Sequence, residues 1–274
     1  MLVSNKLLVD NDCPMCKAYG ACFTRFNLVD NNTISPYQKT NEAFVNDIDL
    51  DRAKNEIALH DTQTHQTLYG LDALIKITTH KSQLFKAIAE FMYPFLFRLY
   101  KLISFNRKVI YPSANTAVGR DCTPDFNLKY RLVYIILVAL FTGVVLHEYS
   151  VSIYSFFGWE SSWFLEIVVC VGQIIWQYVA VKAFRKKNNE ALEYLGNMST
   201  VSLIGGLLLS PVLIIQSFVV LPVLVLVGYF FVVVSLMLLE HIRRCKLKKF
   251  PTLLSASWVL YRMGVLVFIL TIFI

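Results

Sequence analysis

Hydrophobic and polar residues alternate in short blocks up to about residue 129, and long apolar runs follow. The runs approach the ~20 residues that a membrane-spanning helix needs, and they cover residues 131–148, 162–183, 199–217, 219–240 and 253–274. Almost nothing separates the third run from the fourth, so this pair is expected to form a tight hairpin or to be partly re-entrant. The pattern predicts an all-α polytopic transmembrane bundle of about five helices over residues 130–274.

The mixed pattern of residues 1–112 predicts one small domain, with residues 113–129 as a linker to the membrane part. Strands are expected at residues 6–10, 32–37, 56–60 and 66–69. Helices are expected at residues 15–26, 41–54, 70–79 and 84–105, the last with a kink at Pro94. This order suits a thioredoxin-like α/β sheet that is parallel at first and is closed by an antiparallel hairpin.

Composition and charge agree with a membrane protein. The chain is 56% hydrophobic with a mean hydropathy of +0.53, above the roughly 45–50% apolar content of soluble domains. Lys and Arg gather in loops 182–198 and 241–252, whereas loop 149–161 and the turn near residue 218 have none. Basic loops stay in the cytoplasm. We therefore expect a bacterial-type inner-membrane protein in a lipid bilayer, with a cytoplasmic N-terminal domain and the C-terminus outside.

No basic patch interleaved with aromatic residues occurs in the polar half of the chain. The overall positive charge is instead placed in the hydrophobic half, where residues 130–274 carry 11 Lys and Arg against 6 Asp and Glu. This distribution reflects membrane topology and gives no indication of a nucleic-acid partner.

Two cysteines three positions apart follow the first expected strand, in the stretch VDNDCPMC. At a helix N-terminus, the helix dipole and the free N–H groups would stabilise a thiolate on Cys13. Cys16, one turn inside the helix, would be more buried and would resolve a mixed disulfide. Pro14 suits the first helical turn. Asp10 could move protons to and from Cys16, although its charge would also oppose a thiolate.

The spacing of the pair also allows a metal site or two inert buried thiols. A tetrahedral zinc site needs about four ligands, and the chain has no second C-x-x-C motif. The remaining loose candidates for ligands are Cys22, His60, His65 and His80. From the residues alone, redox chemistry, metal binding and a structural role all stay open.

Residues 7–112 resemble the DCC family of predicted thiol–disulfide oxidoreductases, whose signature is an apolar strand followed by D-G-x-C-P-x-C. In VDNDCPMC, Asn11 replaces the usual glycine, and asparagine tolerates the left-handed φ that such a turn can require. A later G-x-D-A-L element of the family is matched by YGLDAL at residues 69–74. Its closing Y-x-x-x-x-x-N-R element is matched by YKLISFNR at residues 100–107.

The resemblance implies a thioredoxin-like fold and a redox-active Cys13/Cys16 dithiol that needs no dissociable cofactor. Its partner would be a protein or small molecule that carries a thiol or a disulfide. Among the other matched residues, Gly70 is expected to serve a turn and Asp72 to cap the helix that follows. Asn106 and Arg107 could bind a carboxylate or phosphate, or could equally cap a helix or form a salt bridge to the domain.

Polar residues in the second apolar run fall on one helix face, because their spacings are four, three and four. They are Glu166, Cys170, Gln173 and Gln177. Arg262 in the fifth run lies at comparable depth and could pair with Glu166. Polar residues in a membrane usually face the bundle interior. We expect a polar seam that serves a thiol relay or a quinone-type site near Cys170, or that only holds the helices together through hydrogen bonds.

Taken together, the residues predict a membrane-anchored thiol–disulfide oxidoreductase in which Cys13 attacks, Cys16 resolves and Asp10 assists. The alternatives are a non-enzymatic membrane-anchored scaffold or metal-binding module, and a transporter or sensor regulated by the dithiol. Cys122, in the linker, could approach Cys13 if the linker folds back, but it is expected to be an exposed thiol without a role. The same expectation holds for Cys245, in a basic loop.

Overall fold

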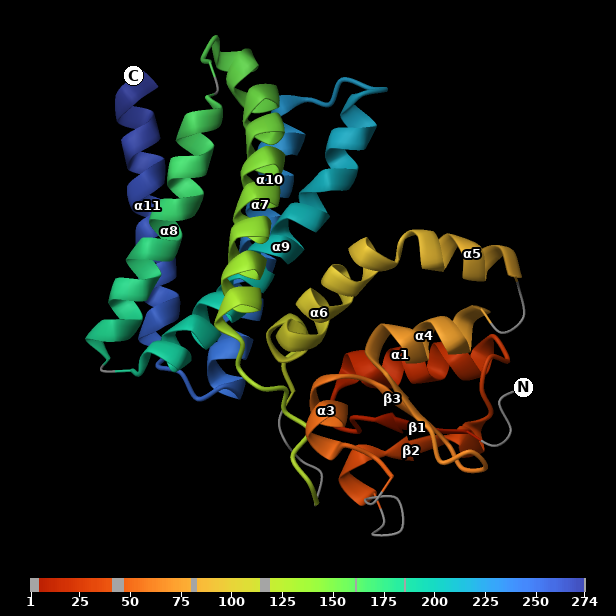
Figure 1. The fold of residues 1–274 in the computed structure, drawn as a ribbon. Helices are drawn as coiled ribbons and strands as arrows, with labels where there is room; N and C mark the ends of the chain where they lie inside the picture. The colour runs from red at the N-terminus through yellow and green to blue at the C-terminus, as the bar shows by residue number, and fades with distance from the viewer. Residues whose placement is uncertain are drawn as a thin grey trace. The chain divides into compact units, whose positions relative to one another are not determined.

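A computed structural model describes residues 5–40, 47–79, 83–113, 119–160, 162–184 and 186–273 (Figure 1). The chain contacts separate it into two compact units. The first unit is Met1–Arg131 and contains the sheet, and the second is Leu132–Ile274 and contains long apolar helices. Each unit is described by itself below.

The first unit is built on a mixed four-stranded sheet with the strand order β2-β1-β3-β4. Its strands are β1 (Asn5–Val9), β2 (Ile34–Pro36), β3 (Ala58–Asp61) and β4 (Thr67–Tyr69). β1 pairs in parallel with β2 and antiparallel with β3, and β3 and β4 form an antiparallel hairpin. The expected combination of a parallel pair with an antiparallel hairpin is therefore confirmed.

β1 is the buried centre of this sheet, and its alternating side chains serve two cores. Leu7 and Val9 pack in one cluster with residues of α1 (Pro14–Arg25) and α4 (Gly70–Thr79). Leu8 packs in a second cluster. Figure 1 shows α1 and α4 together on one face of the sheet. The apolar run of β1 thus places its C-terminal end, and the residues that follow, inside the unit.

The segment before β3 differs from the expected helix at residues 41–54. The described helix there is α3 (Leu50–Asn55), and residues 41–46, with the expected NEAF cap, lie outside the described residues. Asp49 sets the start of α3, because its carboxylate accepts a hydrogen bond of 2.9 Å from the Arg52 N–H. Asp is a strong N-cap residue, so it begins a helix where we expected it inside one.

The expected kink at Pro94 is a break between two helices. α5 (Gln83–Phe91) ends at Phe91, Met92 is the N-cap of α6 (Tyr93–Ile110), and Pro94 lies in the first turn of α6. Proline has no N–H to donate, and the first turn is where a helix does not require one. Pro94 therefore begins a helix here and does not bend one.

Gly70 occupies a turn as expected, with φ at +63° where β4 meets α4. A Cβ at this position would also collide with the Glu56 carboxylate. We expect Gly70→Ala to lower the free energy of unfolding of the first unit by about 1–3 kcal/mol. Gly20→Ala is the matched control, because Gly20 lies inside α1 and a Cβ at this position would make an ordinary contact with the Ile34 side chain. The control should raise stability by about 0.5–1 kcal/mol.

Pulse proteolysis of the full-length protein across a urea series measures both glycine variants. Equal effects of the two substitutions would contradict the assigned backbone strain at Gly70.

The second unit contains five helices that are long and apolar enough to cross a membrane, which confirms the expected number among the described residues. They are α7 (Leu128–Phe157), α8 (Trp163–Ala183), α9 (Asn188–Gln216), α10 (Val223–Leu247) and α11 (Leu253–Phe273). α9 and α10 are long helices joined by residues 217–222, which matches the expected tight hairpin. α9 begins well before the expected residue 199 and includes much of the expected loop.

Side-chain contacts hold this helical unit together. α9 packs against α8 and α10, and α11 packs against α8 and α10. The Tyr149 hydroxyl of α7 donates a 2.8 Å hydrogen bond to the Leu226 carbonyl of α10. The two basic turns lie at the same end of the unit, as Figure 1 shows, and Lys248 forms a 3.0 Å ion pair with Glu193 there. The loop charges are therefore segregated to one end.

Residues 119–127, in the segment expected to be a linker, belong to the first unit and contact its helices. Lys54 forms a 2.6 Å ion pair with Asp125, and the Asn55 side chain donates to the same carboxylate at 2.8 Å. Cys122 is buried, with 5% of its surface exposed. The expectation of an exposed thiol at this position is wrong, because the segment folds back onto α3 and α6.

Candidate dithiol site

The site begins where β1 ends. The Asp10 carboxylate accepts a 2.9 Å hydrogen bond from the Asp12 N–H, and its carbonyl accepts one of 3.2 Å from the Cys13 N–H. Cys13 is the N-cap of α1 and Pro14 follows in the first helical turn. Asn11 does not have the left-handed φ that we allowed for it. The turn is held by Asp10, so it has no need of a glycine.

The two thiols and the aspartate form one compact cluster. Both sulfur atoms and an Asp10 carboxylate oxygen lie within 4.8 Å of one another. Both cysteines are free. Cys13 is 0% exposed and Cys16 is 2% exposed. The expected difference in burial between them is therefore absent, because the whole CPMC turn packs into the core around β1.

The surroundings lower the pKa of the Cys13 thiol to about 6. The largest cause is hydrogen bonding from the Cys16 side chain, which outweighs the opposing effect of burial. The Cys16 backbone N–H and the positive charge of Arg107 lower the pKa further, whereas the Asp10 charge raises it. Cys13 is thus the member of the pair that ionises first.

The pKa of Cys16 is raised in the same cluster. The main cause is its hydrogen bond to Cys13, because it keeps its proton while Cys13 carries the charge, and burial adds to the effect. The Tyr19 side chain, one turn later on α1, acts in the opposite direction on Cys16. The pair therefore behaves as one thiolate that is stabilised by one neighbouring thiol.

Asp10 is held between a neutral donor and two cations. The Gln38 amide donates a 2.8 Å hydrogen bond to Oδ1. Oδ2 lies 3.3 Å from Lys108 Nζ and 3.8 Å from Arg107 Nη2. The Asp10 charge raises the pKa of Cys13 and so opposes the thiolate, whereas the Arg107 charge lowers that pKa and favours the thiolate.

Arg107 is a buried cation whose side chain is hydrogen-bonded within the first unit. Its Nη2 donates to the carbonyls of Lys54, at 2.7 Å, and Cys122, at 2.6 Å. Nη1 lies 3.4 Å from the Asn55 carbonyl. Of the interpretations given for Arg107, the contacts match both structural ones: the guanidinium donates to the last carbonyls of α3, as a helix cap does, and it forms the salt bridge to the domain through Asp10.

Asn106 faces a different neighbour. Its side-chain amide donates to the Leu102 and Tyr130 carbonyls, at 2.8 and 3.0 Å. It is fully buried. Asn106 therefore links α6 to the start of α7 and does not touch the thiols in any described contact.

The two other elements that match the DCC family, YGLDAL and YKLISFNR, contribute packing and hydrogen bonds within the first unit. The Tyr100 hydroxyl accepts a 2.9 Å hydrogen bond from the Ile57 N–H, and its ring packs against the core cluster that includes both thiols. Asp72 accepts a 2.9 Å hydrogen bond from the Tyr93 hydroxyl. It joins α4 to α6 in this way. Asp72 lies inside the first turn of α4 and not before it, so it is not the N-cap residue that we expected.

Three participants escaped the sequence-based search. Gln38 follows β2, Lys108 follows Arg107, and Tyr19 lies one helical turn after Cys16. Only Tyr19 carries a local signal, since positions three apart on a helix are neighbours. The positions of Gln38 and Lys108 depend on contacts across the fold.

Two groups in the described part of the first unit could hold a metal ion by geometry. One is Asp10 with Cys13 and Cys16, and the other is Asp47 with His60 and His65. In the second group, the His65 ring forms a 2.8 Å contact with the Asp47 carboxylate. His80, a loose candidate, lies outside the described residues, and Cys22 is exposed and belongs to neither group.

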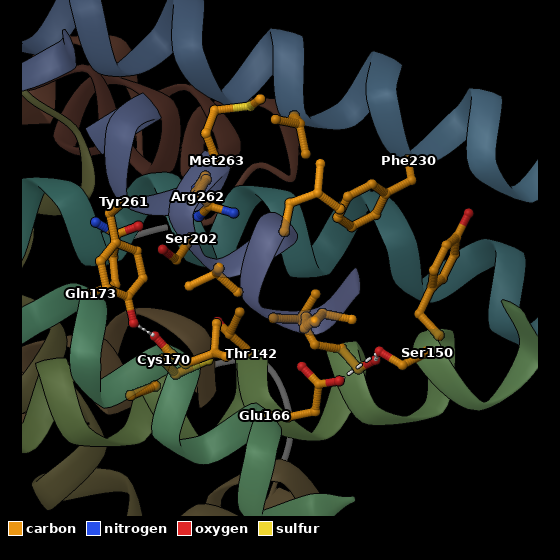
Figure 2. A pocket seen from close by; sticks show the side chains of 18 of the residues that line it. Thr142, Ser150, Glu166, Cys170, Gln173, Ser202, Phe230, Tyr261, Arg262 and Met263 are labelled. Atoms are coloured by element: carbon orange, nitrogen blue, oxygen red, sulfur yellow. Dashed lines mark hydrogen bonds between the residues drawn. The ribbon is translucent and has the colours of Figure 1, made fainter. Parts of the chain in front are cut away.

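The expected polar seam is partly assembled in the second unit. Glu166, Cys170 and Gln173 line a cavity of about 350 Å³, as does Arg262 (Figure 2). Gln177 lies elsewhere and accepts a 2.8 Å hydrogen bond from the Tyr194 hydroxyl. These residues therefore share a helix face but do not all share one site.

The expected ion pair between Glu166 and Arg262 does not form. Glu166 accepts a 2.7 Å hydrogen bond from the Ser150 hydroxyl, and the Arg262 guanidinium lies 4.0 Å from the centre of the Trp258 ring. Although Glu166 and Arg262 were expected at similar depth, Glu166 contacts Ser150 and Arg262 contacts Trp258, so the two do not pair with each other. Cys245 is also buried, at the C-terminal end of α10, which corrects its expected exposure.

No protein-family model, curated protein or solved structure matches this chain. The fold and the five apolar helices define a multi-pass membrane protein that carries a small unit with a mixed sheet.

Proposed function

We propose that this protein is a membrane-anchored thiol–disulfide oxidoreductase of the kind that the DCC resemblance implies. The observation that carries the proposal is the pair of free thiols at the start of α1, whose sulfur atoms lie within 4.8 Å of each other and of the Asp10 carboxylate. The pKa of Cys13 falls to about 6 and that of Cys16 rises. A dithiol exchange needs such a difference, because one cysteine attacks as a thiolate and the other waits as a thiol.

The strand order β2-β1-β3-β4, with the cysteines between β1 and α1, supports a thioredoxin-like origin for the first unit. In that arrangement the nucleophile lies at a helix N-terminus, where the helix dipole favours a negative charge. Cys13 is the N-cap residue of α1, which fits this role.

The proposed reaction moves two electrons from the dithiol to a disulfide of the partner. The Cys13 thiolate attacks one sulfur of that disulfide and releases the other as a thiolate. Cys16 then gives up its proton and attacks the Cys13 sulfur, which releases the second partner sulfur and closes the Cys13–Cys16 disulfide. The carboxylate of Asp10, within 4.8 Å, is placed to accept the Cys16 proton. Two thiols of the cell then reduce the Cys13–Cys16 disulfide by the same exchange and leave joined as a disulfide, which restores the dithiol for the next cycle.

Burial of the attacking sulfur shapes this reaction. Cys13 is 0% exposed, so a partner disulfide reaches it only after a local opening of the structure around the CPMC turn. Exchange should therefore be slower with large disulfides than with small ones at equal thiolate content.

We also propose that the basic end of the helical unit faces the cytoplasm. The support is the segregation of Lys and Arg to the α8–α9 and α10–α11 turns. This places the first unit in the cytoplasm and the C-terminus outside, in the inner membrane of a bacterial-type cell. The cytosol is reducing, so the dithiol would act there as a reductant or sensor.

Single cysteine substitutions in the full-length protein test the exchange. Cys16→Ser should accumulate a mixed disulfide between Cys13 and a small disulfide such as oxidised glutathione, because the resolving thiol is missing. Cys13→Ser should form none. Cys22→Ser is the control, since Cys22 is exposed and lies outside the site, and it should behave as wild type. The adducts are located by peptide mass mapping after acid quenching, so that glutathione on the exposed Cys22 is counted separately from an adduct in the CPMC turn.

An equal yield of adduct from the Cys13→Ser and Cys16→Ser variants would contradict the assigned roles. No adduct from either variant, together with stoichiometric Zn²⁺ binding, would favour the second candidate. That candidate is a metal-binding module, and it rests on the cluster of Asp10, Cys13 and Cys16.

A further inference from the structure

The cavity in the second unit has more polar atoms than its own side chains satisfy. It measures about 350 Å³ and is lined by residues from all five apolar helices, most of them apolar (Figure 2). Ligand pockets for small molecules begin at about this size. The polar atoms that lack partners decide which kind of molecule would fit.

Arg262 is the charged residue among the groups in this cavity that lack hydrogen-bond partners. Its guanidinium contacts the Trp258 ring, and no ion pair or hydrogen bond joins it to any other part of the described chain. Nε is buried and has no hydrogen-bond partner. A cation in the middle of a membrane-spanning helix is costly unless it is paired. An anion in the cavity would remove that cost.

Two further side chains have unsatisfied atoms in the same cavity. Gln173 Nε2 and Thr142 Oγ1 are buried without hydrogen-bond partners, and the two residues are 6% and 9% exposed. They belong to α8 and α7, whereas Arg262 belongs to α11. Three helices therefore supply hydrogen-bond donors to one space, which fits a ligand with several acceptor oxygens.

Glu166, the acidic residue that lines the cavity, does not pair with Arg262. The Glu166 carboxylate accepts from Ser150 at 2.7 Å and forms no ion pair with Arg262. Figure 2 shows Glu166 beside Ser150 and apart from Arg262. The Arg262 guanidinium thus remains available to the anionic group of a ligand in the cavity.

The cavity has lining residues that are also exposed on the apolar surface of the helical unit. Phe231 and Leu266 line it, and both also have large exposed surfaces, 59% and 41%, on helices that are apolar enough to span a membrane. A molecule dissolved in the lipid could therefore enter between α10 and α11. The small volume favours a single hydrocarbon chain over a two-chain phospholipid.

We propose that this cavity binds a single-chain amphiphile with a carboxylate head, such as a free fatty acid. The carboxylate would lie against Arg262, with Gln173 and Thr142 donating to its oxygens, and the chain would follow the apolar lining. All of these residues belong to the second unit, so the outcome does not depend on the dithiol.

Binding of a fluorescent fatty acid, cis-parinaric acid, to the full-length protein in neutral phosphatidylcholine nanodiscs tests the proposal. We expect saturable binding that palmitic acid displaces and that hexadecanol, with the same chain but no charge, displaces at least about tenfold less well. Arg262→Gln should weaken binding by about tenfold or more and remove the preference for acid over alcohol. Arg262→Lys should retain part of both.

Arg243→Gln is the matched control, because it removes the same charge from an exposed residue paired with Glu240. It should leave binding unchanged. If Arg262→Gln does not fold, Gln173→Leu and Thr142→Val carry the test, and each should weaken acid binding several-fold. Equal displacement by the acid and the alcohol, unchanged binding in the cavity variants, or stronger displacement by a short-chain quinone than by palmitic acid would overturn the proposal.

Discussion

Substitution of Arg107 by methionine is expected to lower the free energy of unfolding of the first unit by about 3–5 kcal/mol. Arg107 is 5% exposed, and its guanidinium donates to the carbonyls of Lys54 and Cys122. It also lies 3.8 Å from the Asp10 carboxylate. Methionine keeps most of the side-chain volume, so the loss comes from buried acceptors and a buried charge that are left without a partner.

Pulse proteolysis across a urea series measures this loss in the full-length protein. Arg98→Met is the matched control, because Arg98 lies on the same helix, α6, and is exposed. It should change stability by no more than about 0.5 kcal/mol. Similar losses from both variants would mean that the contacts of Arg107 do not hold the unit together.

The Cys13 thiol is expected to titrate near pH 6, about three pH units below the ordinary value of 9.0. At pH 7 about nine in ten molecules would then carry the thiolate, against about one in a hundred for an unperturbed thiol. The ultraviolet absorbance of the thiolate, taken as wild type minus Cys13→Ser, measures this without a reagent having to reach the buried sulfur. A midpoint at or above pH 8 would remove one support for the oxidoreductase.

The same shifts set how the stability of the reduced protein depends on pH. Between about pH 6 and pH 9 the folded pair holds one proton and the unfolded pair holds two, so stability rises with pH. Above about pH 9 the unfolded chain loses both protons while folded Cys16 keeps its own, so stability falls. Oxidation to the disulfide, which removes both titrating groups, should flatten this profile.

Local patterns in the sequence were enough to place most of the elements. The apolar run before the cysteines predicted β1, and the C-P-x-C turn predicted the start of α1. The five apolar runs predicted five helices. These predictions succeeded because each depends on neighbouring residues: alternation for strands, unbroken apolar length for spans, and proline chemistry at a helix start. Boundaries failed where a single cap, such as Asp49, outweighed the wider pattern.

What the sequence by itself determined is the set of chemical groups: a C-x-x-C pair, an aspartate three residues before it, and a polar face on α8. Only the tertiary structure decided which groups meet. It placed Lys108 and Arg107 beside Asp10, buried Cys122 against Arg107, and left Arg262 without the expected Glu166 partner. The physical reason is that charges act through space while sequence periodicity describes only one element at a time. Contacts between distant elements therefore follow from packing, which no local pattern contains.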